Sequence, residues 1–150
     1  MFDVGEDLTV EDDRGRPAFR VDGKVLTLRK TFVLEDLDGH TLATIRRPLV
    51  AIRDTVSIER PGLPDAKVKH ALLSLLRKRY HVELKGGDLE VEGNIVGHEY
   101  AIKRGRETAA RISKGWFQIR DTYGIEVEAG EDTALMISIA VALEEFDRGE

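Results

Sequence analysis

The stretch that most constrains the fold lies near the C-terminus, where the sequence predicts a helix that is apolar on every side. Asp132 is a favourable N-cap residue, and the run over residues 134–143 has one polar member, Ser138. A helix that is apolar all round is either buried in protein or embedded in a membrane. Spanning a bilayer takes about 20 apolar residues, whereas two glutamates end this run sooner. We therefore expect a central helix over residues 132–146 that the rest of the chain encloses.

The remaining sequence predicts many short antiparallel strands joined by tight turns. Short segments alternate apolar and polar residues, most clearly at 18–21, 24–28, 31–34 and 79–84. Between such segments lie Gly with Asp, Asn, Pro or other turn formers, at 13–15, 22–23, 38–39, 61–62, 86–87, 92–94, 104–105, 114–115, 123–124 and 129–130. A closed antiparallel sheet would surround the helix and leave no sheet edge exposed. We expect a mostly β fold, a closed antiparallel barrel around the C-terminal helix.

An eight-residue pattern recurs along the chain and indicates a repeated fold. Residues 52–59 read IRDTVSIE and residues 119–126 read IRDTYGIE. Related octets begin at 28 and 76, with fainter ones near 4 and 96. Six units of about two strands each predict about twelve strands. The charged residue after each arginine falls in the apolar phase of its strand, which indicates a strand break or bulge rather than a duplicated catalytic site.

One segment carries two conflicting patterns. Within residues 67–77, the apolar side chains fall at helical spacing, which alone predicts an amphipathic helix. The repeat requires a strand that ends near Leu76. We expect a strand interrupted by a short helical turn.

Length and composition favour one intracellular domain. The 150 residues fit a single domain, with a core over about 8–148. The chain has no cysteine, which suits a reducing compartment, and its acidic start does not resemble a signal peptide. We expect a cytoplasmic protein. Any association with a membrane is expected to be peripheral.

The charge is uneven along the chain. The net charge is −5, yet residues 17–125 carry 20 bases and 14 acids. Within this surplus, the candidates for binding an anionic ligand are Arg77, Lys78, Arg79, Lys103, Arg104 and Arg106. Such clusters attract anionic lipid or nucleic-acid phosphate, and the alternative is an ordinary solvated surface of mixed sign.

No motif for catalysis or metal binding stands out. The histidines at 40, 70, 81 and 98 lack metal-ligand spacing, and the serines lack a nucleophile elbow. Residues 86–88 suggest a phosphate loop, but no Gly-Lys-Ser/Thr follows, so we interpret them as a hairpin turn. Trp116-Phe117 is either a membrane-contacting pair or one core residue with one partly exposed neighbour. We expect no catalytic residue, no metal and no cofactor.

The ordered set of short motifs resembles the LURP-one-related family over about residues 8–148. The residues that carry the resemblance are Gly23-Lys24, the run from Leu28 to Asp36, Gly39, Pro48, Ile52 to Thr55, and the ending Asp147-Arg148. The resemblance implies a fold similar to the tubby C-terminal domain and to phospholipid scramblases, with twelve antiparallel strands around a hydrophobic C-terminal helix. The cysteines and calcium-binding segment of scramblase-type relatives are missing from this sequence. Lipid translocation is therefore not expected.

The resulting functional hypothesis is a non-enzymatic tubby-like binding module. Its basic face would engage anionic phospholipid head groups. Nucleic-acid binding by the same face is an alternative, disfavoured by the negative total charge and by the lack of an RNP-like aromatic motif. A scaffold for a small ligand or a protein partner is a further alternative, although a central helix would fill the space where a barrel holds a ligand.

Overall fold

A computed structural model of the chain describes residues 7–12, 14–26, 29–47, 55–73, 77–94, 99–113 and 124–148. Within these residues, the elements in chain order are β1 (Asp7–Glu11), β2 (Pro17–Leu26), β3 (Arg29–Asp36), β4 (Thr41–Arg46), β5 (Thr55–Arg60), β6 (Leu63–Leu73), β7 (Arg77–Glu83), β8 (Leu89–Asn94), β9 (Glu99–Arg104), β10 (Glu107–Ser113), β11 (Gly124–Val127) and α1 (Thr133–Arg148). The eleven strands form one sheet in which each strand pairs antiparallel with the next. The predicted mostly β fold with a C-terminal helix is confirmed.

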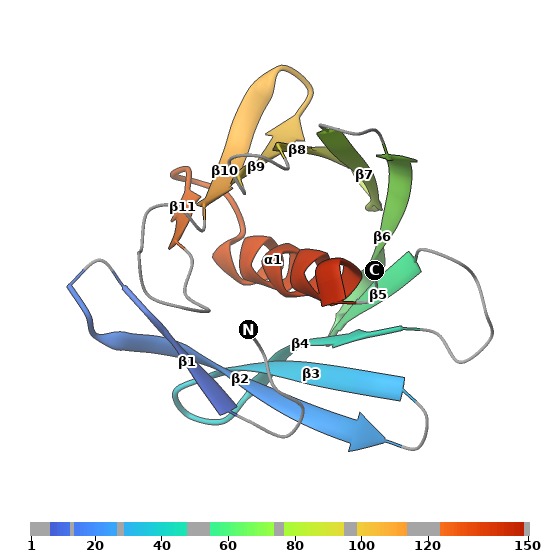
Figure 1. Cartoon of the computed structure of the whole chain (residues 1–150). Coiled ribbons are helices and arrows are strands. Elements are labelled where there is room, and N and C mark those ends of the chain that lie inside the picture. The colour runs from blue at the N-terminus through green and yellow to red at the C-terminus, as the bar shows by residue number, and fades with distance from the viewer. Residues whose placement is uncertain are drawn as a thin grey trace.

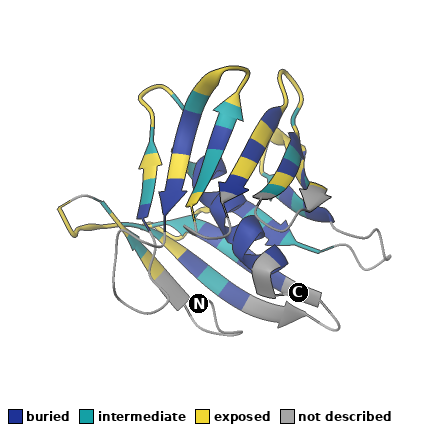
Figure 2. Ribbon diagram, turned by 45° about the horizontal axis from the view of Figure 1, so that its top comes forward, coloured by how far each residue is buried: buried dark blue, intermediate teal, exposed yellow. Residues whose placement is uncertain are grey.

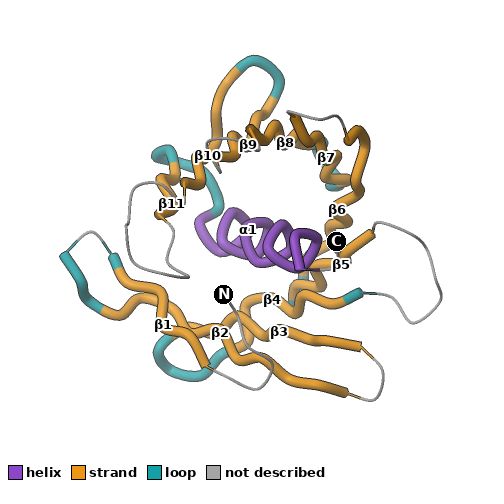
Figure 3. Tube along the Cα trace, in the orientation of Figure 1, coloured by secondary structure: helices purple, strands orange, loops and turns teal. Residues whose placement is uncertain are grey.

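The sheet curves around α1, which lies on its concave side (Figures 1 and 3). Every residue from Leu135 to Phe146 is buried. The all-round apolar pattern predicts this as far as Leu143, whereas the burial of Glu144 and Glu145 lies beyond the predicted run. The Leu135 amide donates to the Asp132 carboxylate over 3.1 Å, so Asp132 is the N-cap. The Ser138 hydroxyl donates to the Ala134 carbonyl over 2.8 Å. The polar side chain within the apolar run is therefore satisfied by the helix itself.

Strand alternation builds the other half of the core. In β5, Val56 and Ile58 are fully buried against the helix side, whereas Ser57 and Glu59 are partly exposed on the outside. Figure 2 shows the same alternation of buried and exposed residues along the other strands. Burial of each aliphatic side chain of this size contributes about 1.5–3 kcal/mol. The concave face of the sheet and the whole circumference of α1 thus form one core.

The closed twelve-stranded barrel that we expected is not observed. In the described part of the chain there are eleven strands, and β1 pairs with β2 and β11 with β10, but β1 and β11 do not pair with each other. Burial of α1 requires the sheet to curve, and a curved sheet can cover a helix without joining its edge strands. The spacing of the repeats carried no information on that last pairing. Residues 114–123, at the start of the last repeat, lie outside the described residues.

The repeat marks strand starts. β3 begins at Arg29 and β7 begins at Arg77, the arginines of two predicted octets. Lys30 and Lys78, the charged residues that follow them, pair regularly with β2 and β8. β5 begins at Thr55, immediately after the corresponding Asp54. Arg53, Asp54 and the copy at 119–123 lie outside the described residues. The copies at 28 and 76 thus mark strand starts, and the break or bulge that we expected at the charged residue is not observed in these two copies.

Two predicted turns are wrong, because their glycines lie inside strands. Asp22-Gly23 is within β2, and Glu92-Gly93-Asn94 is within β8. At Gly93 the reason is a close approach: a Cβ there would lie 2.5 Å from Cε1 of Tyr100, on the neighbouring strand β9. The glycine makes room for an aromatic ring that lies across the strand. The turns at 38–39, 61–62, 86–87, 104–105 and 129–130 are confirmed.

The helical spacing in residues 67–77 also has a strand explanation. β6 runs from Leu63 to Leu73, and its register against β7 shifts between His70 and Leu72. A bulge at this point changes which side chains face the core, so period-two alternation is interrupted in a way that imitates a helix. The expected strand is confirmed as far as Leu73, and no helical turn interrupts it among the described residues. Residues 74–76, where the strand was expected to end, lie outside the described residues.

Candidate anion-binding site

The six cationic residues predicted to bind an anion do not form one face. β7 and β9 both pair with β8, so they run in the same direction. Lys78 is near the start of β7, whereas Arg104 is at the end of β9, and the two residues therefore lie at opposite ends of the sheet. Lys78 is partly buried opposite Gly93. The side chain of Arg77 lies outside the described residues.

Two of the six candidates lie on the outer face of the sheet beside an acid. Arg79 Nη2 is 3.8 Å from Oε1 of Glu92, and Lys103 Nζ is 3.5 Å from Oε2 of the same residue. One carboxylate of β8 thus lies between cations from both neighbouring strands. Lys69 and Glu83 form a similar outer pair at 2.9 Å. The outer face of β6–β9 is a surface of alternating charge, which binds extended polyanions poorly.

The remaining two candidates, Arg104 and Arg106, lie at the β9–β10 turn, and the structure adds Lys85 from the adjacent β7–β8 turn. All three side chains are exposed. The turns are neighbours because β8 pairs with β9. A Cβ built on Gly87 would lie 3.7 Å from Arg104 Nη1, so the β7–β8 turn reaches the guanidinium. We call Lys85, Arg104 and Arg106 the tip site.

Glycine is needed at the β7–β8 turn. Gly86 and Gly87 have φ angles of 97° and 146°, which side chains other than glycine rarely adopt. The sequence predicts this turn, but Lys85, the residue just before it, was not among the predicted anion-binding residues. The sequence nevertheless contains a signal for Lys85. Alternate hairpin turns of an antiparallel sheet lie at the same end of the sheet, so the turns at 85–87 and 104–106 are expected to bring their basic residues to the same end.

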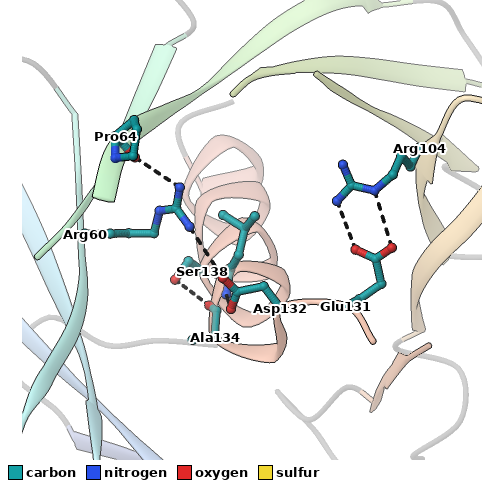
Figure 4. Close-up of polar contacts among 8 residues, drawn as sticks. Arg60, Pro64, Arg104, Glu131, Asp132, Ala134 and Ser138 are labelled. Carbon is teal, nitrogen blue, oxygen red and sulfur yellow. Dashed lines mark hydrogen bonds and ion pairs between the residues drawn. The ribbon is translucent and has the colours of Figure 1, made fainter. Parts of the chain in front are cut away.

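Two ion pairs connect the turns at this end to the start of α1 (Figure 4). Arg104 donates two hydrogen bonds to the Glu131 carboxylate, from Nη2 to Oε1 over 3.0 Å and from Nε to Oε2 over 3.4 Å. This carboxylate raises the pKa of Arg104 above its ordinary value. Arg60, whose side chain is 9% exposed, contacts the Asp132 carboxylate at 3.4 Å and donates to the Pro64 carbonyl over 3.0 Å. The segment that begins the helix is therefore joined to β5 and β9, and Arg60 also joins β5 to β6.

Comparison with known proteins identifies the family of the chain. The model of the LURP-one-related family matches residues 1–144. The chain belongs to the LURP-one-related family. It is 22% identical to the uncharacterized protein YxjI of Bacillus subtilis (strain 168) over 144 residues, which are 96% of this chain and 87% of that protein. No solved structure matches the chain.

A histidine clamp lies beside the tip site of this LURP-one-related protein. His81 Nδ1 is 2.5 Å from Oε1 of Glu90, and His81 Nε2 is 2.9 Å from Oδ2 of Asp88. Asp88 also accepts the Leu84 amide at the turn over 2.9 Å. These contacts, the one with Glu90 most strongly, raise the pKa of His81. A neutral imidazole donates from one nitrogen only, so this geometry favours the protonated ring.

One group of the described side chains has the spacing of a metal site, namely Asp36, Asp38 and His40, whose ligand atoms lie within 4.8 Å of one another. Asp36 already accepts the amides of Asp38 and His40, each over 2.9 Å. These bonds close the β3–β4 turn and lower the pKa of Asp36. The group is therefore accounted for by turn formation.

No helix in the described part of the chain has the length and apolar content needed to cross a membrane.

Proposed function

We propose that this LURP-one-related protein is a non-enzymatic binding module whose tip site holds a phosphate-bearing group, either the head group of an anionic lipid or a soluble phosphorylated molecule. The observation that carries the proposal is the presence of three exposed cations on two adjacent turns. Arg104 supports it further, because Nη1 lies on the side away from Glu131 and faces the Gly86-Gly87 turn. Arginine is well suited to phosphate because its planar fork matches two oxygens at once.

The charges around the tip site favour a small ligand. Other turns at the same end of the sheet carry acids, at Asp12, Asp36, Asp38 and Glu128, and Asp65 lies near the start of β6. A phosphate group at Arg104 meets the cations of the two turns and two nearby acids, Glu131 and Glu107, whereas an extended anionic surface also approaches the acids of the other turns. Each cation contributes about 1 kcal/mol to binding near an anionic surface, and salt weakens the contribution.

Nucleic-acid binding is the weaker alternative on the same observations. Long nucleic acids need a basic stripe that follows several phosphates. Here Arg79 and Lys103 lie beside Glu92 instead.

We place the protein in the cytoplasm as part of the proposal, with contact to a membrane limited to the head groups that the tip site holds.

The test compares two double variants that each remove two positive charges. Lys85→Ala/Arg106→Ala alters the tip site, and Lys67→Ala/Arg111→Ala removes exposed bases from the outer faces of β6 and β10. Calorimetry measures binding of tripolyphosphate, and co-sedimentation measures binding to phosphatidylcholine vesicles with and without phosphatidylserine. Binding that is lost in the first variant and kept in the second supports the proposal.

The two ligand forms separate the two sources of phosphate. Retention on vesicles containing phosphatidylserine indicates a lipid head group, whereas binding of tripolyphosphate without retention indicates a soluble ligand. If the wild-type protein binds neither probe at low salt, or if both double variants bind equally well, the proposed function is wrong.

A further inference from the structure

The tip site shares one of its side chains with the start of the central helix. Arg104 belongs to the cationic group, and it also forms a two-nitrogen contact with Glu131, the residue before the N-cap Asp132. The Arg104 side chain is 43% exposed and that of Glu131 is 21% exposed. A solvent-exposed pair of this kind is weak enough to be displaced by a competing anion.

We infer that Glu131 is an internal competitor for the ligand of the tip site, and that binding of the ligand loosens the connection between β11 and α1. The inference rests on the proposed function. Glu131 occupies the edge of the guanidinium formed by Nε and Nη2, so the edge that faces the Gly86-Gly87 turn is formed by Nη1 and Nη2. A phosphate that takes this second edge shares Nη2 with Glu131 and lies beside its carboxylate. The two like charges repel, so each weakens the hold of the other on Arg104.

The consequence concerns the segment just before α1, because the first turn itself is held in the core by Leu135 and Met136. Among the described contacts, Arg104–Glu131 and Arg60–Asp132 are the ion pairs that join the 131–132 segment to the sheet. Arg60 is largely buried and keeps its additional bond to the Pro64 carbonyl. Ligand binding would therefore weaken the Arg104–Glu131 pair and leave the Arg60–Asp132 pair in place. By reciprocity, weakening the Arg104–Glu131 pair must strengthen ligand binding by the same factor.

The experiment uses a matched pair of neutralised glutamates in the β11–α1 connection. Glu131→Gln removes the competitor, and Glu128→Gln removes one negative charge from an exposed residue of the same segment. If Glu131 competes directly, Glu131→Gln binds tripolyphosphate roughly twofold to fivefold more tightly than Glu128→Gln does. Circular dichroism and thermal unfolding check that both variants are folded.

A second measurement needs no variant of Glu131. Hydrogen exchange of the amides of residues 128–132 in the wild-type protein should become faster when tripolyphosphate binds, because the Arg104–Glu131 ion pair is weakened. Exchange in Lys85→Ala/Arg106→Ala should not respond to the same concentration.

The outcomes distinguish the inference from the proposed function. If the wild-type protein binds through the tip site, but Glu131→Gln is no tighter than Glu128→Gln or exchange at 128–132 stays constant or slows, the inference is wrong and the proposed function stands. If tripolyphosphate does not bind, or Lys85→Ala/Arg106→Ala binds it normally, both are wrong.

Discussion

Replacement of Gly93 by alanine tests the packing of β8 against β9 directly. A Cβ at position 93 would lie 2.5 Å from Cε1 and 2.7 Å from Cδ1 of Tyr100, whereas favourable carbon contacts are about 3.5–4.0 Å. The tyrosine ring must therefore move by about 1 Å, and overpacking of this kind costs about 1–3 kcal/mol. Alanine also loses less chain entropy than glycine on folding, which offsets about 0.4–1 kcal/mol. We expect Gly93→Ala to lower the free energy of unfolding by about 1–2 kcal/mol.

Urea unfolding followed by circular dichroism measures this loss, which corresponds to a fall in Tm of roughly 2–8 °C for a chain of this length. The double variant Gly93→Ala/Tyr100→Ala supplies the control, because without the ring the added methyl group has room. A double-mutant cycle should show that Gly93→Ala costs much less in the Tyr100→Ala background than in the wild type. A Gly93→Ala protein as stable as the wild type, or an equal loss in both backgrounds, would refute the close approach.

Three further predictions concern α1 and the histidine clamp. Ile139→Ala, at a fully buried position of α1, should lower the free energy of unfolding by about 2–5 kcal/mol in urea, and a loss below 1 kcal/mol would contradict the central place of the helix. Asp132→Ala should lower the free energy of unfolding by about 0.5–2 kcal/mol, because the N-cap is lost. Asp132→Asn should lower it less, because the asparagine side-chain oxygen can still accept the Leu135 amide. Equal losses in the two variants would argue against the cap. Because the clamp raises the pKa of His81 above its ordinary 6.5, its contribution to stability is complete below pH 6.5 and is lost as the pH rises through the pKa of the folded protein. An NMR titration should place the His81 pKa above 6.5, and His81→Gln should remove this part of the pH dependence; a lower pKa would contradict the clamp.

The helix and most of the strands were predictable because their signals are local and strong. The run from Ala134 to Leu143 allows only a surrounding of apolar side chains, and Asp132 marks where it begins. Period-two alternation and positive-φ glycines likewise act within a few residues, which is why the turns at Gly39, Gly62, Gly86 and Gly105 were predicted correctly. These signals need no knowledge of what lies across the sheet.

The errors came from contacts between distant residues. Gly93 looks like a turn residue in the sequence, and its role appears only once Tyr100 lies opposite it. The bulge in β6 depends on its pairing with β7. Whether the edge strands pair with each other depends on the overall curvature of the sheet, which no local pattern reports.

The candidate site was predicted in part for the same reason. Sequence proximity grouped Lys103 with Arg104, but strand alternation sends neighbouring side chains to opposite faces, and Lys103 lies beside Glu92 while Arg104 holds Glu131. Lys85 was missed because it is distant in sequence from Arg104 and meets it only through the pairing of β8 with β9. Charge counting along the chain thus found the right region of the surface but not its members.

The most direct test of the anion-binding account is an NMR titration of the glycine amides with tripolyphosphate. Gly86, Gly87 and Gly105 form the two turns of the tip site, whereas Gly15 and Gly39 lie in other turns at the same end of the sheet. The account predicts saturable shifts of the first three amides, abolished in Lys85→Ala/Arg106→Ala, with Gly15 and Gly39 unaffected. Shifts of equal size at all five glycines, or none at Gly86, Gly87 and Gly105, would contradict it.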